Sequence, residues 1–495
     1  MHGFSVATQP VNLFYAFLGC LIGTLVGVLP GLGPTAAMSL LLPATLHVQP
    51  VTAIVMLAGI YYGAMYGGST TSILVNIPGE AASVMTCMDG YQMARQGKAG
   101  RALGISAFGS FIAGTLGLIG LTIMAPPLAT FALKFGPPEY FSLMTMGLVA
   151  LSFLTSTSMV RSIMMALFGV ILGTVGTDTV SGSARFTFGM TEMLDGIGLV
   201  PMIMGLFGMS EIFINLEANT ERDIFTSKVK GLLPTAADWV QSRWAILRGS
   251  VIGFFLGILP GGGAVLSSFV AYAVEKRFSK YPEKFGTGLI EGVAAPEAAN
   301  NSAAQAAFIP LLTLGLPANV VMALLLGALI LHGVTPGPLL MTQSPEIFWG
   351  VIASMYMGNI MLLVLNLPLI GLWVQLLRIP YHYLFPVIVV FCIIGSYSVA
   401  TSLLDVLFMF AFGLLGYFLK KLKFETPPLV LAFVLAPLIE YYFKSSLMFS
   451  HGDFSVFFSR PLSLFFLILT ASLLLWSIVS AILKKPAIAI PKEDE

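Results

Sequence analysis

Two short stretches of polar side chains stand out in this sequence because the residues around them are small or apolar. One reads GGSTTSILVN and the other EAANNSAAQ. Their polar residues are Ser69, Thr70, Thr71, Ser72 and Asn76 in the first stretch and Asn300, Asn301, Ser302 and Gln305 in the second. Clustered hydroxyl and amide groups in an apolar chain favour a site that binds a polar ligand. Hydrogen bonding between closely packed helices stays open as the alternative.

Two carboxylates lie beside these stretches, and neither stretch contains Lys or Arg. Glu80 and Glu297 are candidate cation ligands or proton carriers, although a glutamate at a loop edge also serves as a solvated helix cap. An anionic substrate would be held by helix N-termini, backbone N–H groups and neutral donors, with a bound cation offsetting its charge. The pattern therefore favours symport with Na⁺ or H⁺. A Na⁺ ion would lie near exposed carbonyls of broken helices, with its ligands open, and no cofactor is expected.

The motifs of several enzyme classes are absent from this sequence. The glycine-rich stretches lack GxxxxGK[ST], no HExxH or GxSxG occurs, and the five histidines are scattered. Ser69 would need a base to act as the nucleophile of an intramembrane hydrolase, and no His or Lys stands near it in the sequence. We expect no catalytic residues and no enzyme activity.

Interrupted helices are the elements that must position these polar groups. GVLPGLG and GILPGGG recur at a constant offset of 230, which pairs Gly27, Pro30, Gly31 and Gly33 with Gly257, Pro260, Gly261 and Gly263. Proline lacks an N–H and glycine destabilises helices, so both clusters predict helix breaks. In lipid, the freed backbone groups must line a cavity or meet inside the protein, and two matching breaks indicate a transporter site near the midplane. Tight turns at the membrane surface are the alternative.

The composition places the whole chain in a bilayer. Of its 495 residues, 57% are hydrophobic and 9% are charged, and the mean hydropathy is +0.91. Apolar runs such as Ala102 to Ala125 are long enough to cross about 30 Å of hydrocarbon, so we predict an all-α polytopic membrane protein. A net charge of +1 gives no sign of a nucleic-acid partner. The first ten residues carry no Lys or Arg, so we expect the first span to be retained rather than cleaved as a signal peptide.

The order of the motifs predicts two repeats of inverted topology. We assign 1–220 to an N-terminal repeat, 221–248 to a cytoplasmic or interfacial linker, and 249–495 to a C-terminal repeat with one extra C-terminal helix. Each repeat should contain a hairpin or re-entrant helix pair broken at its Pro/Gly motif, a second broken helix and about four further helices.

The positions of Lys and Arg predict the orientation of these repeats. They collect in 95–101, 222–248, 276–284, 420–423 and 484–485. Because short cytoplasmic loops hold the excess of positive charge, the N-terminus is predicted to be periplasmic and the C-terminus cytoplasmic. The isolated exceptions are Lys134, Arg185, Lys444 and Arg460.

Several stretches resemble a known family. They are GVLPGLGPT, YYGAMYGGSTTSILVNIPGEA with DGYQMARQGKAGRALG, GILPGGGA, and EGVAAPEAANNSAAQAAFIPLLTLGLPANV with LLGALILHGVTPGPLL. Together they resemble the large permease subunit of the tripartite tricarboxylate transporters (TctA-type). The resemblance implies ion-gradient-driven uptake of a di- or tricarboxylate across the bacterial inner membrane. It also implies two partners, a small integral membrane subunit and a periplasmic solute-binding protein that delivers the substrate. A stand-alone carrier for another organic anion is the alternative, and a homodimer stays open.

Carried over to this sequence, the resemblance implies a substrate site. Its residues are Gly31, Gly33, Pro34, Thr35, Ser69, Thr70, Thr71, Asn76, Gly262, Gly263, Asn300, Asn301 and Ser302. The stretch STTSILVN carries more hydroxyls than the SIPAILLN-like form of the family, and Gln305 adds an amide among small residues. These departures leave the identity of the carboxylate open.

Overall fold

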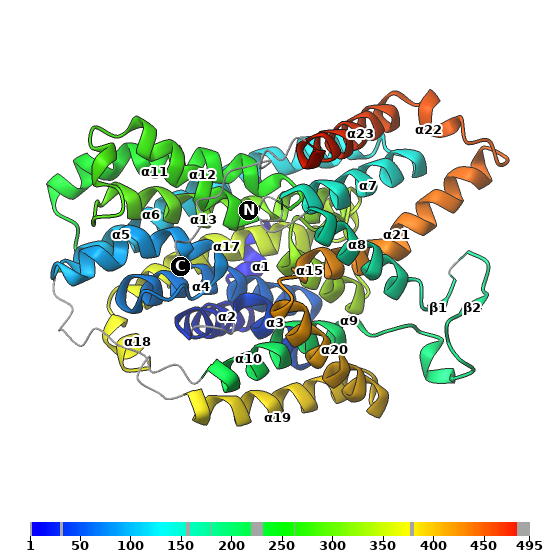
Figure 1. Cartoon of the computed structure of the whole chain (residues 1–495), viewed down its shortest axis with the longest axis horizontal. Helices are drawn as coiled ribbons and strands as arrows, with labels where there is room; N and C mark the ends of the chain where they lie inside the picture. The colour runs from blue at the N-terminus through cyan, green and yellow to red at the C-terminus, as the bar shows by residue number, and fades with distance from the viewer. Residues whose placement is uncertain are drawn as a thin grey trace. The chain divides into compact units, whose positions relative to one another are not determined.

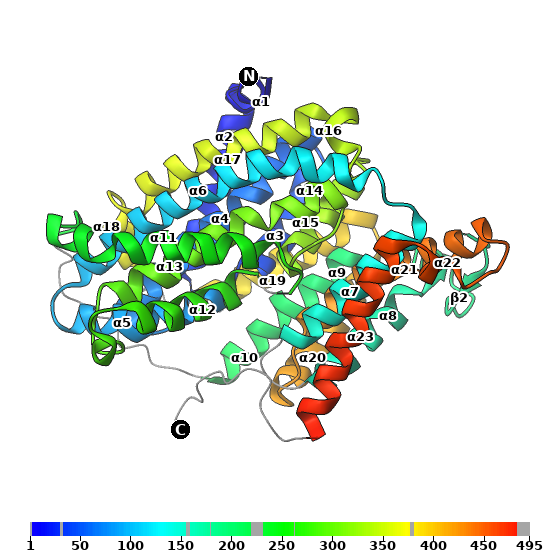
Figure 2. The ribbon, with the colours of Figure 1, turned by 90° about the horizontal axis from the view of Figure 1, so that it is seen from above.

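The computed structural model describes residues 2–29, 33–154, 159–178, 180–218, 231–261, 263–376 and 381–482. Most of these residues are helical, as Figures 1 and 2 show, which confirms the predicted all-α polytopic class. The chain forms two compact units: unit 1 comprises Met1–Ala132 and Val200–Tyr417, and unit 2 comprises Leu133–Leu199 and Phe418–Glu495. Each unit contains segments of both predicted repeats, whose boundaries stay a prediction.

Unit 1 contains the polar stretches and both Pro/Gly motifs. Its elements are α1 (His2–Ala7), α2 (Pro10–Val28), α3 (Gly33–Thr45), α4 (Pro50–Val75), η1 (Ala81–Ser83), α5 (Val84–Arg95), α6 (Ala99–Ala132), α9 (Leu199–Ile203, which begins at the unit boundary), η3 (Met204–Met209), α10 (Ser210–Ala218), α11 (Ala236–Ile258), α12 (Gly263–Phe278), η4 (Pro282–Lys284), α13 (Glu291–Ala306), α14 (Phe308–Leu314), α15 (Val320–Leu331), α16 (Leu340–Gln343), α17 (Pro345–Asn366), α18 (Ile370–Leu376), α19 (Tyr381–Ala400) and α20 (Leu403–Lys421, which ends beyond the unit boundary).

In unit 2, several of the basic residues that did not fit the predicted topology form ion pairs with acidic residues. Its elements are α7 (Pro137–Leu154), α8 (Met159–Gly173), β1 (Gly176–Thr177), β2 (Ala184–Arg185), η2 (Thr191–Met193), α21 (Pro427–Phe449), α22 (Val456–Ser459) and α23 (Pro461–Ile482), and β1 pairs with β2 in antiparallel register. Arg185 binds Glu440, Lys444 binds Asp178, and Arg460 binds a glutamate of α7. The hydrogen bond from Lys444 holds the pKa of Asp178 well below its ordinary value. Arg185, Lys444 and Arg460 thus have acidic partners within unit 2.

Seven of the described helices are long and apolar enough to cross a membrane. They are Pro10–Val28, Pro50–Val75, Ala99–Ala132, Leu199–Glu217, Pro345–Asn366, Leu403–Lys421 and Pro427–Phe449. The chain is therefore a multi-pass membrane protein.

Glycines bring the helices of unit 1 into close contact in two corresponding pairs. In the first pair, α2 packs on α4, and a Cβ added to Gly23 would lie 2.5 Å from the carbonyl oxygen of Ile60. In the second, α11 packs on α13, and a Cβ added to Gly253 would lie 2.2 Å from the carbonyl oxygen of Ala299. Only glycine permits these approaches, as in other small-residue helix interfaces.

The two pairs follow a fixed numerical relation along the chain. Gly19, Gly23 and Gly27 lie against the carbonyls of Met56, Ile60 and Ala64, while Gly249, Gly253 and Gly257 lie against those of Ala295, Ala299 and Ala303. The glycines differ by 230 and the carbonyl residues by 239. The second half therefore has nine more residues than the first between its glycine-bearing helix and the carbonyls that those glycines contact.

The helix breaks lie after the polar stretches rather than within them. Helix α4 runs without interruption through Ser69 to Val75 and ends at Asn76, which adopts a left-handed conformation with φ 59°. Gly315 ends α14 in the same conformation, with φ 69°. A proline follows two residues later in each case, at Pro78 and Pro317. Because proline has no N–H and restricts the residue before it, the helix cannot continue there.

Candidate functional site

The carboxyl group of Glu297 is the centre of a buried polar cluster in unit 1. Glu297 lies on α13 and is fully buried. Ser69 of α4 donates a hydrogen bond to its Oε2 at 2.5 Å, and Thr86 of α5 donates one to its Oε1. The hydroxyls of Ser106 and Ser110 on α6 also face this carboxyl. Four hydroxyls from three helices therefore surround one acid.

Glu80 is a second buried carboxyl beside this cluster. It caps η1, since its Oε2 accepts a hydrogen bond from the backbone N–H of Ala82 at 2.6 Å. Its Oε1 accepts a hydrogen bond from Asn300 Nδ2 at 3.1 Å, and the carboxyl is near enough to Glu297 for their charges to repel. Within the described ranges, no Lys or Arg forms an ion pair with either acid. The loop-edge position thus makes Glu80 both a cap and a member of the cluster.

Three amide side chains on α13 contain polar atoms without a partner. Asn300, Asn301 and Gln305 are fully buried. Asn301 Nδ2 donates to Ser110 Oγ at 2.7 Å and to the backbone oxygen of Glu297 at 3.1 Å. Among the described residues, nothing hydrogen-bonds to Oδ1 of Asn300 or Asn301, or to either polar atom of Gln305. Buried polar groups are rarely left this way, so the amides mark a place where a ligand is expected.

The tips of the two broken hairpins are helix N-termini. Helix α3 begins at Gly33 with φ +58°, and α12 begins at Gly263 with φ +49°, a conformation that favours glycine. Pro34 is buried and Thr35 half-buried in the first turn of α3. The two other glycines predicted at these tips, Gly31 and Gly262, lie outside the described residues. The N–H groups of a first helical turn have no intrahelical partner, so both tips suit an anion.

Several predicted site residues bind backbone groups instead of facing the cluster. Thr71 Oγ1 donates to the carbonyl oxygen of Val28, at the last residue of α2, at 2.6 Å. Ser302 Oγ donates to the carbonyl oxygen of Ser250 at 2.7 Å, which joins α13 to α11. Thr70 is buried. The hydrogen bonds of Thr71 and Ser302 thus join the helices that support the site.

Asn76 lies apart from the polar cluster. Its side chain is exposed, and its left-handed backbone ends α4. Asparagine is one of the few residues other than glycine that adopts this conformation readily. The structure gives Asn76 the role of a helix cap.

Asn319 is a member of the site region that sequence reasoning missed. It caps α15 by accepting a hydrogen bond from the N–H of Met322, and its Nδ2 donates to Tyr61 of α4 at 3.2 Å. A Cβ added to Gly263 would lie 3.8 Å from the Asn319 side chain, which places Asn319 at the second hairpin tip. The sequence pattern could have indicated Asn319, because it follows a proline and a small residue as Glu80 does.

Glu80 and Asn319 occupy corresponding positions in the two halves of the chain, and each binds a residue of the other half. Glu80 and Asn319 differ by 239, and so do Tyr61 and Asn300. Asn300 binds Glu80, and Asn319 binds Tyr61, so each cap residue contacts the long helix of the other half. Reciprocal contacts of this kind arise when two related halves pack about a pseudo-two-fold axis.

Asp89 joins the two halves at one end of unit 1. This buried residue of α5 accepts hydrogen bonds from the N–H groups of Gly286, Gly288 and Leu289 and from the hydroxyl of Tyr272. Thr86 stands one turn earlier on the same helix. By fixing α5 to the segment that precedes α13, Asp89 positions the Thr86 hydroxyl against Glu297.

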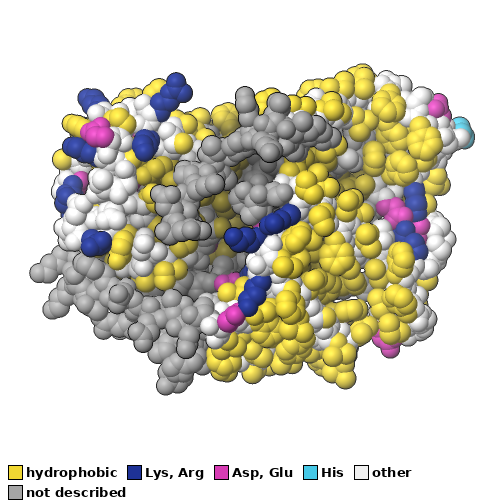
Figure 3. Space-filling model, in the orientation of Figure 1, with side chains coloured by type: hydrophobic (Ala, Val, Ile, Leu, Met, Phe, Trp, Pro, Cys, Tyr) yellow, Lys and Arg dark blue, Asp and Glu magenta, His cyan; other side chains and the backbone are white. Residues whose placement is uncertain are grey.

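The positive charges of both halves gather at this same end. The predicted cytoplasmic stretch 95–101 contacts the residues that follow 276–284, since Gln96 Nε2 donates to the carbonyl of Thr287 at 2.7 Å. Arg101 of the first loop binds Asp238 of α11, and Arg248 binds Glu275 of α12. Figure 3 shows Lys and Arg over the region of α5, α11 and α12, whereas much of the remaining visible surface is hydrophobic.

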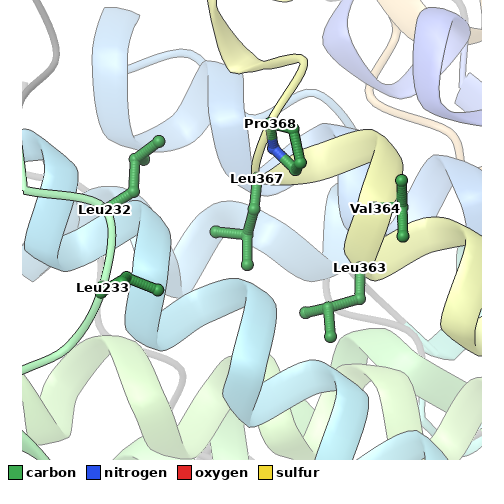
Figure 4. A pocket seen from close by; sticks show the side chains of 6 residues that line it. All are labelled: Leu232, Leu233, Leu363, Val364, Leu367 and Pro368. Carbon is green, nitrogen blue, oxygen red and sulfur yellow. The ribbon is translucent and has the colours of Figure 1, made fainter.

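A shallow pocket elsewhere in unit 1 has no polar lining. It is formed by Leu232, Leu233, Leu363, Val364, Leu367 and Pro368, shown in Figure 4. Without a donor or a charge among these side chains, the pocket does not suit a carboxylate. The buried polar cluster is the better candidate site.

Comparison with known proteins places the chain among transport components. The model of the tripartite tricarboxylate transporter TctA family matches residues 13–431. A relative from Agrobacterium vitis, "Uncharacterized 52.8 kDa protein in TAR-I ttuC' 3'region", is 52% identical over 461 residues, which are 93% of this chain and 92% of the relative. From the same organism, "Uncharacterized protein in TAR-II ttuC' 3'region" is 56% identical over 211 residues, which are 43% of this chain and 87% of that relative. No solved structure matches the chain.

Proposed function

Because the chain belongs to the tripartite tricarboxylate transporter TctA family, we propose that it is the permease that takes up a di- or tricarboxylate across the bacterial inner membrane. A gradient of Na⁺ or H⁺ drives the uptake. A small integral membrane subunit acts with the permease, and a periplasmic solute-binding protein delivers the substrate. The chain transports its substrate unchanged and carries out no catalysis.

The observation that carries this proposal is the buried cluster around Glu297. Polar and ionisable side chains inside a membrane protein are costly and generally belong to transport pathways. Here two carboxyls and three partly unpaired amides lie within the helices of unit 1, without a basic partner among the residues described. An acid without a base requires a proton or a cation, which supports coupling to an ion gradient.

The hairpin tips support an anionic substrate. Helices α3 and α12 both begin at a glycine, and their first N–H groups and positive dipole ends can hold carboxylate oxygens. The predicted site residues Gly31, Gly33, Pro34 and Thr35 belong to one tip and Gly262 and Gly263 to the other. In this proposal Asn300 and Asn301 line the site from α13, and the atoms that they leave unpaired are their Oδ1 acceptors.

The reciprocal contacts support an internal duplication with inverted topology, in which the two tips meet near the midplane. The gathering of Lys and Arg around α5, α11 and α12 supports a cytoplasmic location for that end of unit 1. We therefore keep the N-terminus periplasmic and the C-terminus cytoplasmic in the proposed orientation.

Uptake by reconstituted protein tests the proposal. The full chain, with the small subunit and the binding protein, is placed in proteoliposomes and supplied with radiolabelled di- and tricarboxylates under an imposed Na⁺ or H⁺ gradient. We expect gradient-dependent accumulation of at least one carboxylate, and its loss when the binding protein is omitted. Accumulation without the partners would instead support a stand-alone carrier.

A matched pair of variants connects the uptake to the site. Asn300→Ala removes the amide that binds Glu80, and we expect uptake to fall at least about tenfold, the effect of 1.4 kcal/mol. Asn366→Ala is the control, because Asn366 is also a buried asparagine with an unpaired Oδ1 but lies at the end of α17. If no carboxylate accumulates with all three proteins assembled, the proposed substrate class is wrong.

A further inference from the structure

The negative charge of Glu297 has no compensation among the described side chains. The carboxyl is fully buried, its direct partners are hydroxyls, and Glu80 adds a second negative charge nearby. Burying an unpaired ion is strongly destabilising, even after the protein relaxes. A bound positive charge is therefore required at this position whenever Glu297 is ionised.

The hydroxyls around Glu297 are arranged for a carboxylate and a cation together. Ser69 and Thr86 donate to opposite oxygens of the carboxyl, so that both oxygens act as acceptors. A hydroxyl that donates its hydrogen still has lone pairs available. Hard cations prefer oxygen ligands from carboxylates, amides and other neutral groups. The same hydroxyl oxygens can therefore complete a coordination shell.

The amide of Asn301 supplies a ligand atom of fixed orientation. Its Nδ2 is committed to Ser110 Oγ and to the backbone oxygen of Glu297, so its oxygen is the atom that remains without a donor. An unsatisfied buried acceptor is destabilising, because it has lost its hydrogen bonds to water. Glu297 and Asn301 stand one turn apart on α13. A cation next to both would satisfy the amide oxygen as well as the charge, whereas a proton on Glu297 adds a single donor.

From this arrangement we propose that unit 1 contains a Na⁺ site centred on the Glu297 carboxylate. Asn301 Oδ1 and the hydroxyl oxygens of Ser69, Thr86 and Ser110 are its further ligands. The inference rests on the proposed function, which leaves the choice between Na⁺ and H⁺ open, and it replaces exposed helix carbonyls with side-chain oxygens as the main ligands. One carboxylate at the centre matches one monovalent cation.

The described residues at the matching positions of the two halves do not repeat these ligands. At the offset of 239, the positions that match Glu297 and Asn301 are Ala58 and Tyr62, and the position that matches Ser69 is Phe308. All three are buried. The proposal therefore requires one Na⁺ ion per chain.

Direct binding of ²²Na⁺ tests the site without any carboxylate or partner protein. The purified full chain in lipid nanodiscs is titrated with ²²Na⁺ at constant ionic strength, with choline as the replacing cation. We expect saturable binding of one ion per chain. Glu297→Gln should weaken the affinity at least about tenfold, and Ser110→Ala several-fold.

The control is Glu291→Gln, the same change on the same helix at the residue that binds Ser279 near the basic end of unit 1. It should retain the affinity of the unaltered chain. Thermal unfolding of each variant verifies that it is folded, and Ser110→Ala decides the question if Glu297→Gln is not folded.

Absence of saturable ²²Na⁺ binding to the unaltered chain would overturn the Na⁺ site. Binding that is unchanged in the folded variants would also overturn it. Neither result would disprove carboxylate uptake, which is measured separately and could be driven by H⁺.

Discussion

Helix α4 carries Ala58 and Tyr62 at the positions where α13 carries Glu297 and Asn301, counted at the offset of 239 that the helix contacts share. Both helices pack against a glycine-lined partner. Helix α4 and the helix that follows α13, α14, each end in a left-handed residue two positions before a proline. Their buried side chains nevertheless differ in kind, since α4 carries tyrosines where α13 carries amides, and an alanine where α13 carries the acid.

This difference separates the requirements of the scaffold from those of the site. Close backbone contact depends on the absence of a side chain, so glycine is needed on α2 and on α11 alike. A charge in the interior needs its own ligands and is destabilising where they are missing. Both helix pairs therefore need the same glycines, whereas only the pair that contains α13 needs the polar side chains of the cluster.

The largest expected effect comes from removing polar groups at two matched positions, Asn301 on α13 and Tyr62 on α4. Asn301→Leu removes a hydrogen-bonding amide from the site, and we expect carboxylate uptake to fall about 100-fold or more. Tyr62→Phe removes a hydroxyl that has no hydrogen-bond partner among the described residues, so uptake and stability should change little. Uptake by the proteoliposome system measures both.

Equal losses in the two variants would break the comparison, since they would show that α4 takes part in binding as much as α13. Thermal unfolding of Asn301→Leu distinguishes a lost site from a lost fold.

The corresponding glycines should show equal rather than different effects. Gly23→Ala and Gly253→Ala each place a Cβ within 2.5 Å of a carbonyl oxygen on the facing helix. Overpacking of this kind costs about 1–3 kcal/mol, and we expect similar decreases in thermal stability for both. Gly371→Ala is the control, because nothing lies within 4 Å of its added Cβ. A decrease in only one of the two interface variants would show that the pairs are not equivalent.

A more local effect is expected where Asp89 of the first half binds the 286–289 segment of the second half. Asp89 binds the 286–289 segment, whereas its match at the offset of 239 is Ala328. Asp89→Asn replaces an acceptor oxygen with a donor facing backbone N–H groups and should destabilise this contact by about 1–3 kcal/mol. Hydrogen exchange measured by mass spectrometry should become faster in residues 286–289.

The matched control is Asp453→Asn, which alters an exposed turn in unit 2. Exchange in 286–289 that stays as slow as in the unaltered chain would contradict the role given to Asp89.

The smallest effect is expected at the helix ends. Asn76→Gly keeps the left-handed conformation that ends α4, so both stability and uptake should be retained within about 1 kcal/mol. Gly315→Ala, at the matched position, should lower stability by roughly 1–2 kcal/mol, because alanine is strained at positive φ. Thermal unfolding and uptake measure the pair. A large loss of uptake in Asn76→Gly would restore Asn76 to the substrate site.

Much of the candidate site could be predicted from the sequence, because polar residues are rare in membrane-spanning segments and therefore stand out. The polar residues around Ser69 and Asn301 were visible against apolar neighbours, and the paired Pro/Gly motifs predicted the breaks at Gly33 and Gly263. The choice between binding and capping could not be made for Glu80 or Asn76, since both roles use the same residue types at the end of a helix. Gly31 and Gly262 stay predictions.

The sequence by itself determined the membrane class, the recurrence of its motifs and the residue types available for binding. Composition and local spacing are sufficient for these, because the bilayer requires apolar spans and proline and glycine interrupt helices wherever they occur together. Only the tertiary structure decided which polar groups meet. Ser69 and Thr86 lie 228 and 211 residues from Glu297 along the chain, yet both donate to its carboxyl. Small residues let α2 and α4, and α11 and α13, pack closely enough to support this arrangement. Contacts of this range depend on how helices cross, which no local pattern encodes.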